Sequence, residues 1–242
     1  DVVNHHAAQM DVRRSVDDPL LDARINILGL IRLLEGCKRL KVKRVIYASS
    51  GGAVYGEQEA FPALEDHPKR PESPYGVSKL TGEHYLNYYQ TAFAIPSVSL
   101  RYANVYGPRQ RADGEAGVIA IFIHHLLDGR SPKINGDGKQ TRDYVYIGDV
   151  VAANLLALES PYTGALNIGT GNETDVLSLF ELLCKKMGLQ VAAVHGAAKT
   201  GEQRRSSLDS SRAREKLGWS PRTTLGQGLG KTIEYYRRSN IE

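Results

Sequence analysis

The stretch Arg44-Val45-Ile46-Tyr47-Ala48-Ser49-Ser50, which runs into Gly51-Gly52, decides how this chain folds. A continuous apolar run is typical of a strand buried on both faces of a sheet, and the glycine pair predicts a turn where the strand ends. Further strands are expected at 1–4 and 97–102, with helices at 18–34 and about 75–93. Strands that alternate with helices predict a doubly wound α/β fold, a parallel sheet with helices on both faces.

The helix expected at 18–34 begins with Asp18-Pro19, a capping residue followed by a proline in the first turn. Helical spacing of its apolar residues predicts one apolar face. That face would consist of Leu21, Ile25, Leu28, Ile31 and Leu34.

Beyond Gly107-Pro108 the alternation loosens and then returns. We expect helices at 118–127, 149–159, 175–187 and 225–238, strands at 142–147 and 165–168, and short elements at 210–217. The segment Gly169-Thr170-Gly171-Asn172-Glu173-Thr174 could be mistaken for a dinucleotide-binding loop, but it lacks a third glycine and no acidic strand end follows it. We expect a plain turn, with Thr174 or Asp175 capping the next helix.

Composition narrows the class of function. The chain has 242 residues, 41% of them hydrophobic, and its formal charge of +4 is spread without a basic run, which suits anionic small molecules better than nucleic acid. No apolar run reaches the ~18 residues of a membrane span and no signal peptide is visible, so we expect a cytoplasmic protein. Cys37 and Cys184 are expected to be buried thiols. The pairs His5-His6 and His124-His125 lack metal-ligand spacing, so no metal site is expected.

The stretch Ser73-Pro74-Tyr75-Gly76-Val77-Ser78-Lys79 carries the chemistry. A serine before a proline is a normal helix opening, and the i, i+4 spacing places Tyr75 and Lys79 on one face of that helix. A nearby ammonium favours the phenolate, so we expect Lys79 to lower the pKa of Tyr75 from its ordinary value near ~10 and make it a base. The alternative is that Tyr75 packs and Lys79 is solvated.

Several motifs in order along the chain carry a resemblance to a known family. They are His6-Ala7-Ala8, Asn26, Ser49-Ser50 with Val54-Tyr55-Gly56, Ser73 to Lys79, Leu100-Arg101-Tyr102-Ala103-Asn104-Val105-Tyr106-Gly107-Pro108, Gln140-Thr141-Arg142-Asp143-Tyr144 and Leu217-Gly218-Trp219. The chain resembles the extended short-chain dehydrogenases/reductases that act on nucleotide sugars, and within them the UDP-glucose 4-epimerases.

This resemblance implies an NAD(P)-binding Rossmann-like domain at 1–107, with a return at about 141–175, and a smaller α/β domain for the sugar nucleotide mainly at 108–242. The family's GxxGxxG turn and its acidic residue for the adenosine ribose would precede Asp1. We therefore expect the Rossmann-like domain to be N-terminally truncated, by roughly 60 residues at ~30 residues for each βαβ unit.

The resemblance also implies a reaction, the NAD-dependent inversion of C4 of a UDP-hexose through a transient 4-keto sugar. Tyr75 would accept the proton of the 4-hydroxyl, Ser50 would hydrogen-bond the 4-oxygen, and Lys79 would hold the nicotinamide ribose. Matching from the strand side places the catalytic hydroxyl at Ser50, and matching from Val54-Tyr55-Gly56 places it at Gly51, which has none. Ser49 is the fallback.

The binding residues follow from the same resemblance. Those expected to contact NAD are Ala7, Ala8, Gln9, Asn26, Ser49, Tyr75, Lys79 and Tyr102. Those expected to contact the UDP-sugar are Ser50, Asn104, Arg142, Lys199, Glu202 and Ser206. An ion pair of Arg142 with Asp143 or Asp149 is the alternative for that residue. A small residue at Ser206, where glucose-restricted epimerases tend to carry tyrosine, leaves room for an N-acetyl group.

Other activities remain as rivals. The family's 4,6-dehydratases carry an Asp-Glu pair after the catalytic hydroxyl and its decarboxylases keep a glutamate there, whereas this chain has Gly51, Gly52 and Ala53, which cannot transfer protons. An epimerase of a different nucleotide sugar is a further rival within the family. A fragment that binds sugar nucleotide without catalysis is the rival from another class. The family commonly forms homodimers through the helices at 20–34 and 75–93, and the resemblance therefore implies a homodimer. From the sequence alone, these helices could equally be covered within one chain.

Overall fold

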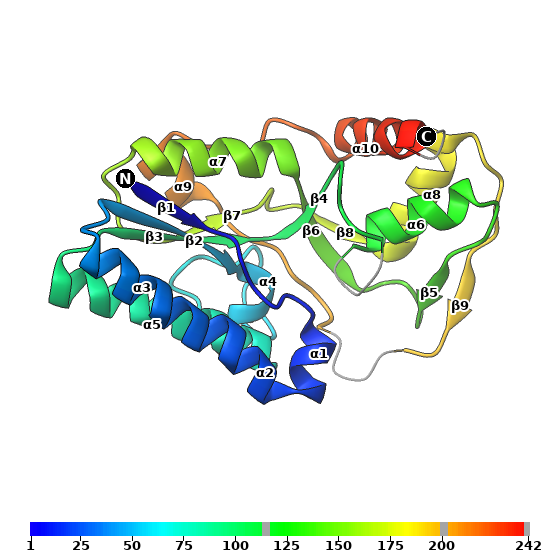
Figure 1. Ribbon diagram of the computed structural model, residues 1–242. Helices are drawn as coiled ribbons and strands as arrows, with labels where there is room; N and C mark the ends of the chain where they lie inside the picture. The colour runs from blue at the N-terminus through cyan, green and yellow to red at the C-terminus, as the bar shows by residue number, and fades with distance from the viewer. Residues whose placement is uncertain (113–116, 199–202, 240–242) are drawn as a thin grey trace.

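The computed structural model describes residues 1–112, 117–198 and 203–239. Its main sheet has four parallel strands in the order β1 (Val2–His5), β2 (Arg44–Ser50), β3 (Ser97–Tyr102) and β7 (Gly164–Ile168). The helices α3 (Gly29–Arg39) and α5 (Pro74–Phe93) cover one face, and α7 (Ile147–Glu159) and α9 (Ser211–Leu217) cover the other (Figure 1). The predicted doubly wound α/β architecture is confirmed.

The structure describes further elements before, between and after these. They are α1 (Val12–Asp17), α2 (Pro19–Ala23), the π-helical turn η1 (Arg24–Leu28), α4 (Gly51–Val54), β4 (Asn104–Tyr106), α6 (Val118–Leu127), β5 (Lys133–Asn135), β6 (Thr141–Tyr146), β8 (Glu173–Asp175), α8 (Val176–Met187), β9 (Val194–Gly196) and α10 (Leu225–Ser239). Most predicted elements are confirmed within two residues at each end.

The helix pair α2–α3 departs from its predicted apolar face. Ile25 and Leu28 were expected on that face but are 42% and 49% exposed, whereas Leu34 is buried as expected. The cause is η1, because a π-helical turn holds more residues than an α-helical turn and rotates the side chains on either side of it relative to each other. The buried residues of this part of the helix are instead the polar Asp22 and Asn26.

Helix α5 begins as its sequence predicts. The Ser73 hydroxyl accepts a hydrogen bond from the backbone N–H of Gly76 at 3.1 Å, and Pro74 occupies the first helical position. One helical turn after Lys79, Gly82 faces β2. A Cβ at this position would lie 2.5 Å from the Tyr47 hydroxyl oxygen. The helix therefore depends on this glycine for its close approach to the sheet.

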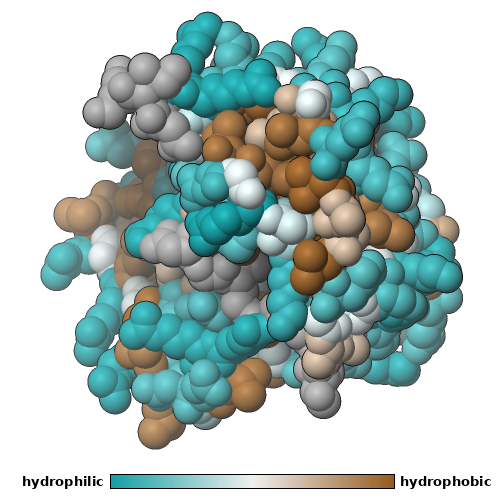
Figure 2. All heavy atoms as spheres, turned by 90° about the vertical axis from the view of Figure 1, so that its right-hand side faces the viewer, coloured by the Kyte–Doolittle hydropathy of each residue, from teal (hydrophilic) through white to brown (hydrophobic). Residues whose placement is uncertain are grey.

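The second half of the chain forms two small sheets, β4-β6-β8 and β5-β9. Helices α6, α8 and α10 pack around a separate hydrophobic core there. Figure 2 views this end of the molecule, where hydrophobic residues gather between hydrophilic ones.

The turn after β7 joins the two halves. Buried Asp143 of β6 accepts hydrogen bonds from the backbone N–H groups of Thr170 and Gly171 and from the Thr170 hydroxyl, at 2.6–3.0 Å. The segment is a plain turn, as predicted, and Asp175 caps α8 by accepting from Ser178 N–H at 2.8 Å. The backbone N–H groups of the turn after β7 thus bind a carboxylate of the chain itself, that of Asp143.

Two features are absent from the described residues. Among them no helix is both long enough and apolar enough to cross a membrane. Within the same residues, no cluster of three or more His, Cys, Asp or Glu side chains could hold a metal ion.

The contact between Gly82 and Tyr47 yields a prediction. Gly82→Ala should lower the free energy of unfolding by about 1–3 kcal/mol, because the added methyl group overpacks the contact between α5 and β2. Gly36→Ala in α3 is the matched control, since nothing lies within 4 Å of a Cβ there and alanine stiffens the unfolded chain; it should gain about 0.4–1 kcal/mol. Urea unfolding measures both, and equal effects of the two variants would contradict the prediction.

Candidate active site

The carboxyl ends of the parallel strands meet the first turn of α5. Ser50 ends β2 and lies opposite Tyr102, the last residue of β3. The Ser50 hydroxyl faces Tyr75 closely enough to lower the pKa of that phenol by hydrogen bonding. On the other side, the Tyr75 backbone N–H donates to the Ser15 hydroxyl of α1 at 3.1 Å. The structure therefore brings together the hydroxyl and the phenol that the sequence placed in different elements.

Lys79 lies one helical turn further along α5 and is buried. Its ammonium donates to the Ala48 carbonyl of β2 at 2.7 Å and lies 4.9 Å from the ring centroid of Tyr47 and 5.7 Å from that of Tyr75. Burial lowers the pKa of Lys79 to about 8, although the carboxylates of Asp22 and Glu83 act in the opposite direction. The alternative of a solvated Lys79 is wrong.

The expected effect of Lys79 on Tyr75 is not observed. Burial raises the pKa of Tyr75 to about 12, opposed by the hydrogen bond with Ser50 and assisted by the charge of Asp22. The prediction of a lowered pKa considered only the charge of Lys79 and neglected desolvation of the phenol, which is the larger effect here. A role for Tyr75 as a base thus requires further positive charge beside the phenol.

The neighbouring Ser49 has a different environment. Successive strand residues point to opposite faces, and the Ser49 hydroxyl donates to Glu83 at 2.6 Å. Glu83 also binds Arg101 of β3 in a buried bidentate ion pair, with contacts of 2.9 and 2.6 Å. Ser49 therefore belongs to a buried polar network, and Ser50 is the serine that reaches Tyr75.

The loop that follows β1 is held to η1 by hydrogen bonds between the Gln9 backbone and the Asn26 side chain. The Gln9 backbone N–H donates to Asn26 Oδ1 at 2.9 Å, and Asn26 Nδ2 donates back to the Gln9 carbonyl at 2.8 Å. Asn26 lies on η1, a kind of turn that often occurs at functional sites. Ala7 and Ala8 precede this anchor, at the carboxyl end of β1.

Tyr102 faces the opposite side of the sheet, toward α7. Its hydroxyl exchanges hydrogen bonds with the side-chain amide of Asn154 at 2.8–3.2 Å, and its ring stacks on His6 with centroids 6.2 Å apart. Burial raises the pKa of Tyr102 to about 12. Sequence reasoning missed Asn154 and also Asp22, since neither belongs to a motif and only the folded chain brings them to the site.

The residues expected to contact the sugar nucleotide lie beyond this edge. Asn104 is partly buried on β4, and Arg142 of β6 donates to the Thr141 carbonyl at 2.8 Å. The two carboxylates considered as its partners have other ligands: Asp143 binds the turn after β7, and Asp149 accepts from the Thr223 N–H at 3.0 Å.

Ser206 is buried beside Gly52, where a Cβ would lie 4.0 Å from the Ser206 hydroxyl oxygen. The predicted contacts Lys199 and Glu202 lie outside the described residues.

Comparison with known proteins places this arrangement in context. The model of the NAD dependent epimerase/dehydratase family matches residues 1–169. A UDP-glucose 4-epimerase of Mycolicibacterium smegmatis is 45% identical, over 99% of this chain and 77% of its own length.

Two solved structures have nearly the same fold. The UDP-glucose 4-epimerase of Thermotoga maritima, solved with UDP-glucose, has a TM-score of 0.97 and 46% identity, covering 100% of this chain and 78% of its own. A UDP-N-acetylglucosamine 4-epimerase of Methanobrevibacter ruminantium has a TM-score of 0.95 and 34% identity, covering 99% of this chain and 77% of its own. The chain belongs to the NAD-dependent epimerase/dehydratase family.

Proposed function

We propose that the chain inverts the configuration at C4 of a UDP-hexose, interconverting UDP-glucose and UDP-galactose through a transient 4-keto sugar, with NAD as cofactor. The observation that carries this proposal is that Ser50 and Tyr75 face each other at the carboxyl edge of the sheet, with the buried Lys79 one helical turn behind them. The family match and the near-identical folds of two 4-epimerases support it.

Each of the three residues has a proposed task. Ser50 holds the 4-oxygen by a hydrogen bond, and Tyr75 takes the proton of the 4-hydroxyl and later returns it to the 4-keto oxygen. Lys79, whose ammonium lies 5.7 Å from the centre of the Tyr75 ring, orients the ribose of the cofactor. When bound, NAD supplies a hydride acceptor and donor for C4, so the reaction has no net oxidation.

The residues around the edge of the sheet fit NAD in chemical type. Lys79 offers donors for ribose hydroxyls, and the small side chains of Ala7 and Ala8 permit close approach of a cofactor to the loop after β1. We propose that the contacts to NAD are Ala7, Ala8, Gln9, Asn26, Ser49, Tyr75, Lys79 and Tyr102. We propose that the contacts to the UDP-sugar are Ser50, Asn104, Arg142, Lys199, Glu202 and Ser206.

The packing and the chemistry of the three residues that follow Ser50 favour an epimerase over a dehydratase. A Cβ at Gly51 would lie 2.4 Å from Leu208 Cδ1, so an acidic side chain cannot be placed there without displacing Leu208. Gly52 and Ala53 likewise offer no group that could move a proton at C5 or C6 of the sugar. At positions 51–53 the chain therefore offers no acid-base pair for elimination, which favours reaction at C4 alone.

Proton NMR of the anomeric signals tests this function. A protein carrying these 242 residues, given UDP-galactose and NAD, should form UDP-glucose, and Tyr75→Phe should reduce the rate by about 10²–10⁴-fold because the proton acceptor is lost. Tyr88→Phe, on an exposed position of the same helix, should keep the parent rate. Absence of conversion by the parent protein, or full activity of Tyr75→Phe, would contradict the proposal.

We infer that UDP-N-acetylglucosamine is accepted as well. The small Ser206 side chain borders Gly52, and we place the 2-substituent of the sugar beside this pair. Neither residue has a side chain large enough to fill that space. Ser206→Tyr should lower kcat/KM for the acetylated sugar by about 10–200-fold relative to UDP-galactose, since the ring fills that space. Ser206→Ala should leave the ratio unchanged. An unchanged ratio in Ser206→Tyr would show that residue 206 does not set this specificity.

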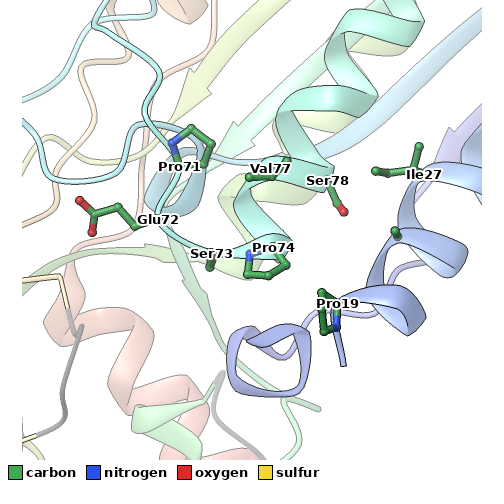
Figure 3. Close-up of a pocket in the computed structure, with 9 residues that line it drawn as sticks. Pro19, Ile27, Pro71, Glu72, Ser73, Pro74, Val77 and Ser78 are labelled. Carbon is green, nitrogen blue, oxygen red and sulfur yellow. The ribbon is translucent and has the colours of Figure 1, made fainter. Parts of the chain in front are cut away.

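We also infer a homodimer formed by α2, η1 and α5. Large apolar side chains are exposed on these elements, among them Leu20, Leu28 and Val77. A groove of about 510 Å³ separates α2 from the start of α5, with Pro19, Pro74 and Val77 on its walls (Figure 3). Covering such a surface with a second copy would remove apolar area from water.

Sedimentation velocity tests the dimer. The parent protein should sediment as a dimer and Leu28→Asp as a monomer, because a buried unpaired charge opposes association. Leu155→Asp is the control, on the exposed face of α7, and it should remain dimeric. A monomeric parent protein, or a dimer that survives Leu28→Asp, would contradict this assembly.

A further inference from the structure

Asp22 is a buried carboxylate that the proposed reaction does not use. It lies on α2 and is 1% exposed. Gln9 Nε2 and Asn26 Nδ2 donate to its Oδ1 at 3.0 and 2.9 Å, and the Ser78 hydroxyl donates to its Oδ2 at 2.6 Å. One side chain thus connects three segments: the loop after β1, the turn η1 and the catalytic helix α5. Ser78 lies on the part of α5 that borders the groove with α2 (Figure 3).

These hydrogen bonds do not require a charge. The three donors are neutral groups, and an asparagine at position 22 could accept from both amides with its oxygen and donate to the Ser78 oxygen with its nitrogen. Burial of a carboxylate costs more than burial of an amide, so a structural tie alone would favour the neutral residue. The charge of Asp22 therefore calls for a separate explanation.

Several ionisable groups surround the neighbouring Lys79. Glu83 lies one turn along α5, Tyr47 comes from β2 and His5 from β1. Burial alone would favour the neutral amine, and the carboxylates of Asp22 and Glu83 oppose that effect. Glu83 is already bound in the ion pair with Arg101, so Asp22 is the carboxylate whose partners are all uncharged.

We propose that Asp22 is a positioning residue with two separable roles: its hydrogen bonds align the loop after β1 with α5, and its charge keeps Lys79 an ammonium at neutral pH. The catalytic meaning of the second role rests on the function proposed above, in which a charged Lys79 stands beside Tyr75. The charge effect itself is independent of that function, because it is a property of the folded chain.

Two variants separate the roles. Asp22→Asn keeps the hydrogen bonds and removes the charge, whereas Ser78→Ala keeps the charge and removes one hydrogen bond. In the parent protein, burial lowers the pKa of Lys79 to about 8 against the opposing charges of Asp22 and Glu83. Loss of the nearby negative charge disfavours the ammonium, so the pKa should fall by about one unit in Asp22→Asn. Lys79 would then become largely neutral near pH 7.5.

The measurement is the titration of the Lys79 Cε signal by NMR on protein labelled with ¹³C-lysine, with the signal assigned by its loss in Lys79→Met. Asp22→Asn should move the midpoint down by about one pH unit, and Ser78→Ala should leave it within about 0.3 unit while lowering the melting temperature. Should Asp22→Asn not fold, Asp22→Ser provides a second neutral variant with the same expected shift. An unchanged midpoint in the neutral variant would overturn the proposal and leave Asp22 a purely structural residue.

The pH dependence of epimerisation gives a second readout. Asp22→Asn should move both limbs of the rate profile to lower pH, because loss of the carboxylate lowers the pKa of Lys79 and that of Tyr75 alike. Because the NMR titration requires no turnover, a parent protein without epimerase activity would count against the proposed function, whereas a fixed midpoint would count against Asp22.

Discussion

Helix α5 lies against β2 closely enough for the Lys79 ammonium to reach the Ala48 carbonyl at 2.7 Å, and the rest of the site depends on this contact. Gly82 permits it, because a side chain there would meet the Tyr47 ring. The same contact places Tyr75 within reach of Ser50, although one residue comes from a helix and the other from a strand. Burial follows from this closeness and sets the protonation of both ionisable groups, downward in pKa for the amine and upward for the phenol.

The two consecutive serines at the end of β2 show how a pleated strand divides its tasks. Ser50 points to the edge where chemistry is proposed, and Ser49 points into a network with Glu83 and Arg101. That network continues through the Tyr55 hydroxyl, which accepts from Arg101 at 2.8 Å and donates to Asn167 of β7 at 2.7 Å. The residue beside the reactive one thus stabilises the sheet from which the reactive one extends.

Features encoded by near neighbours were predictable from the sequence. The start of α5 at Ser73-Pro74 and the Asp175 cap of α8 depend on residues within one turn, and both occur as expected. The exposed positions of Ile25 and Leu28 were not predictable, because the π-helical turn is stabilised by contacts of Asn26 with a loop 17 residues away. The prediction that the pKa of Tyr75 is lowered was wrong for a related reason. Charges adjacent in sequence can be counted, but desolvation depends on the whole fold.

The wall beside the proposed sugar site is held by its backbone. The Leu208 N–H donates to Asp143 at 3.2 Å, the Ser207 N–H to Gln58 at 3.0 Å, and the Ser207 carbonyl accepts from the Ala63 N–H at 2.9 Å. All three bonds use main-chain atoms of the wall, so none depends on which side chain stands at position 206. The backbone of the wall therefore does not itself fix the side chain at position 206. A change of substrate preference through this residue would leave the three backbone hydrogen bonds of the wall in place.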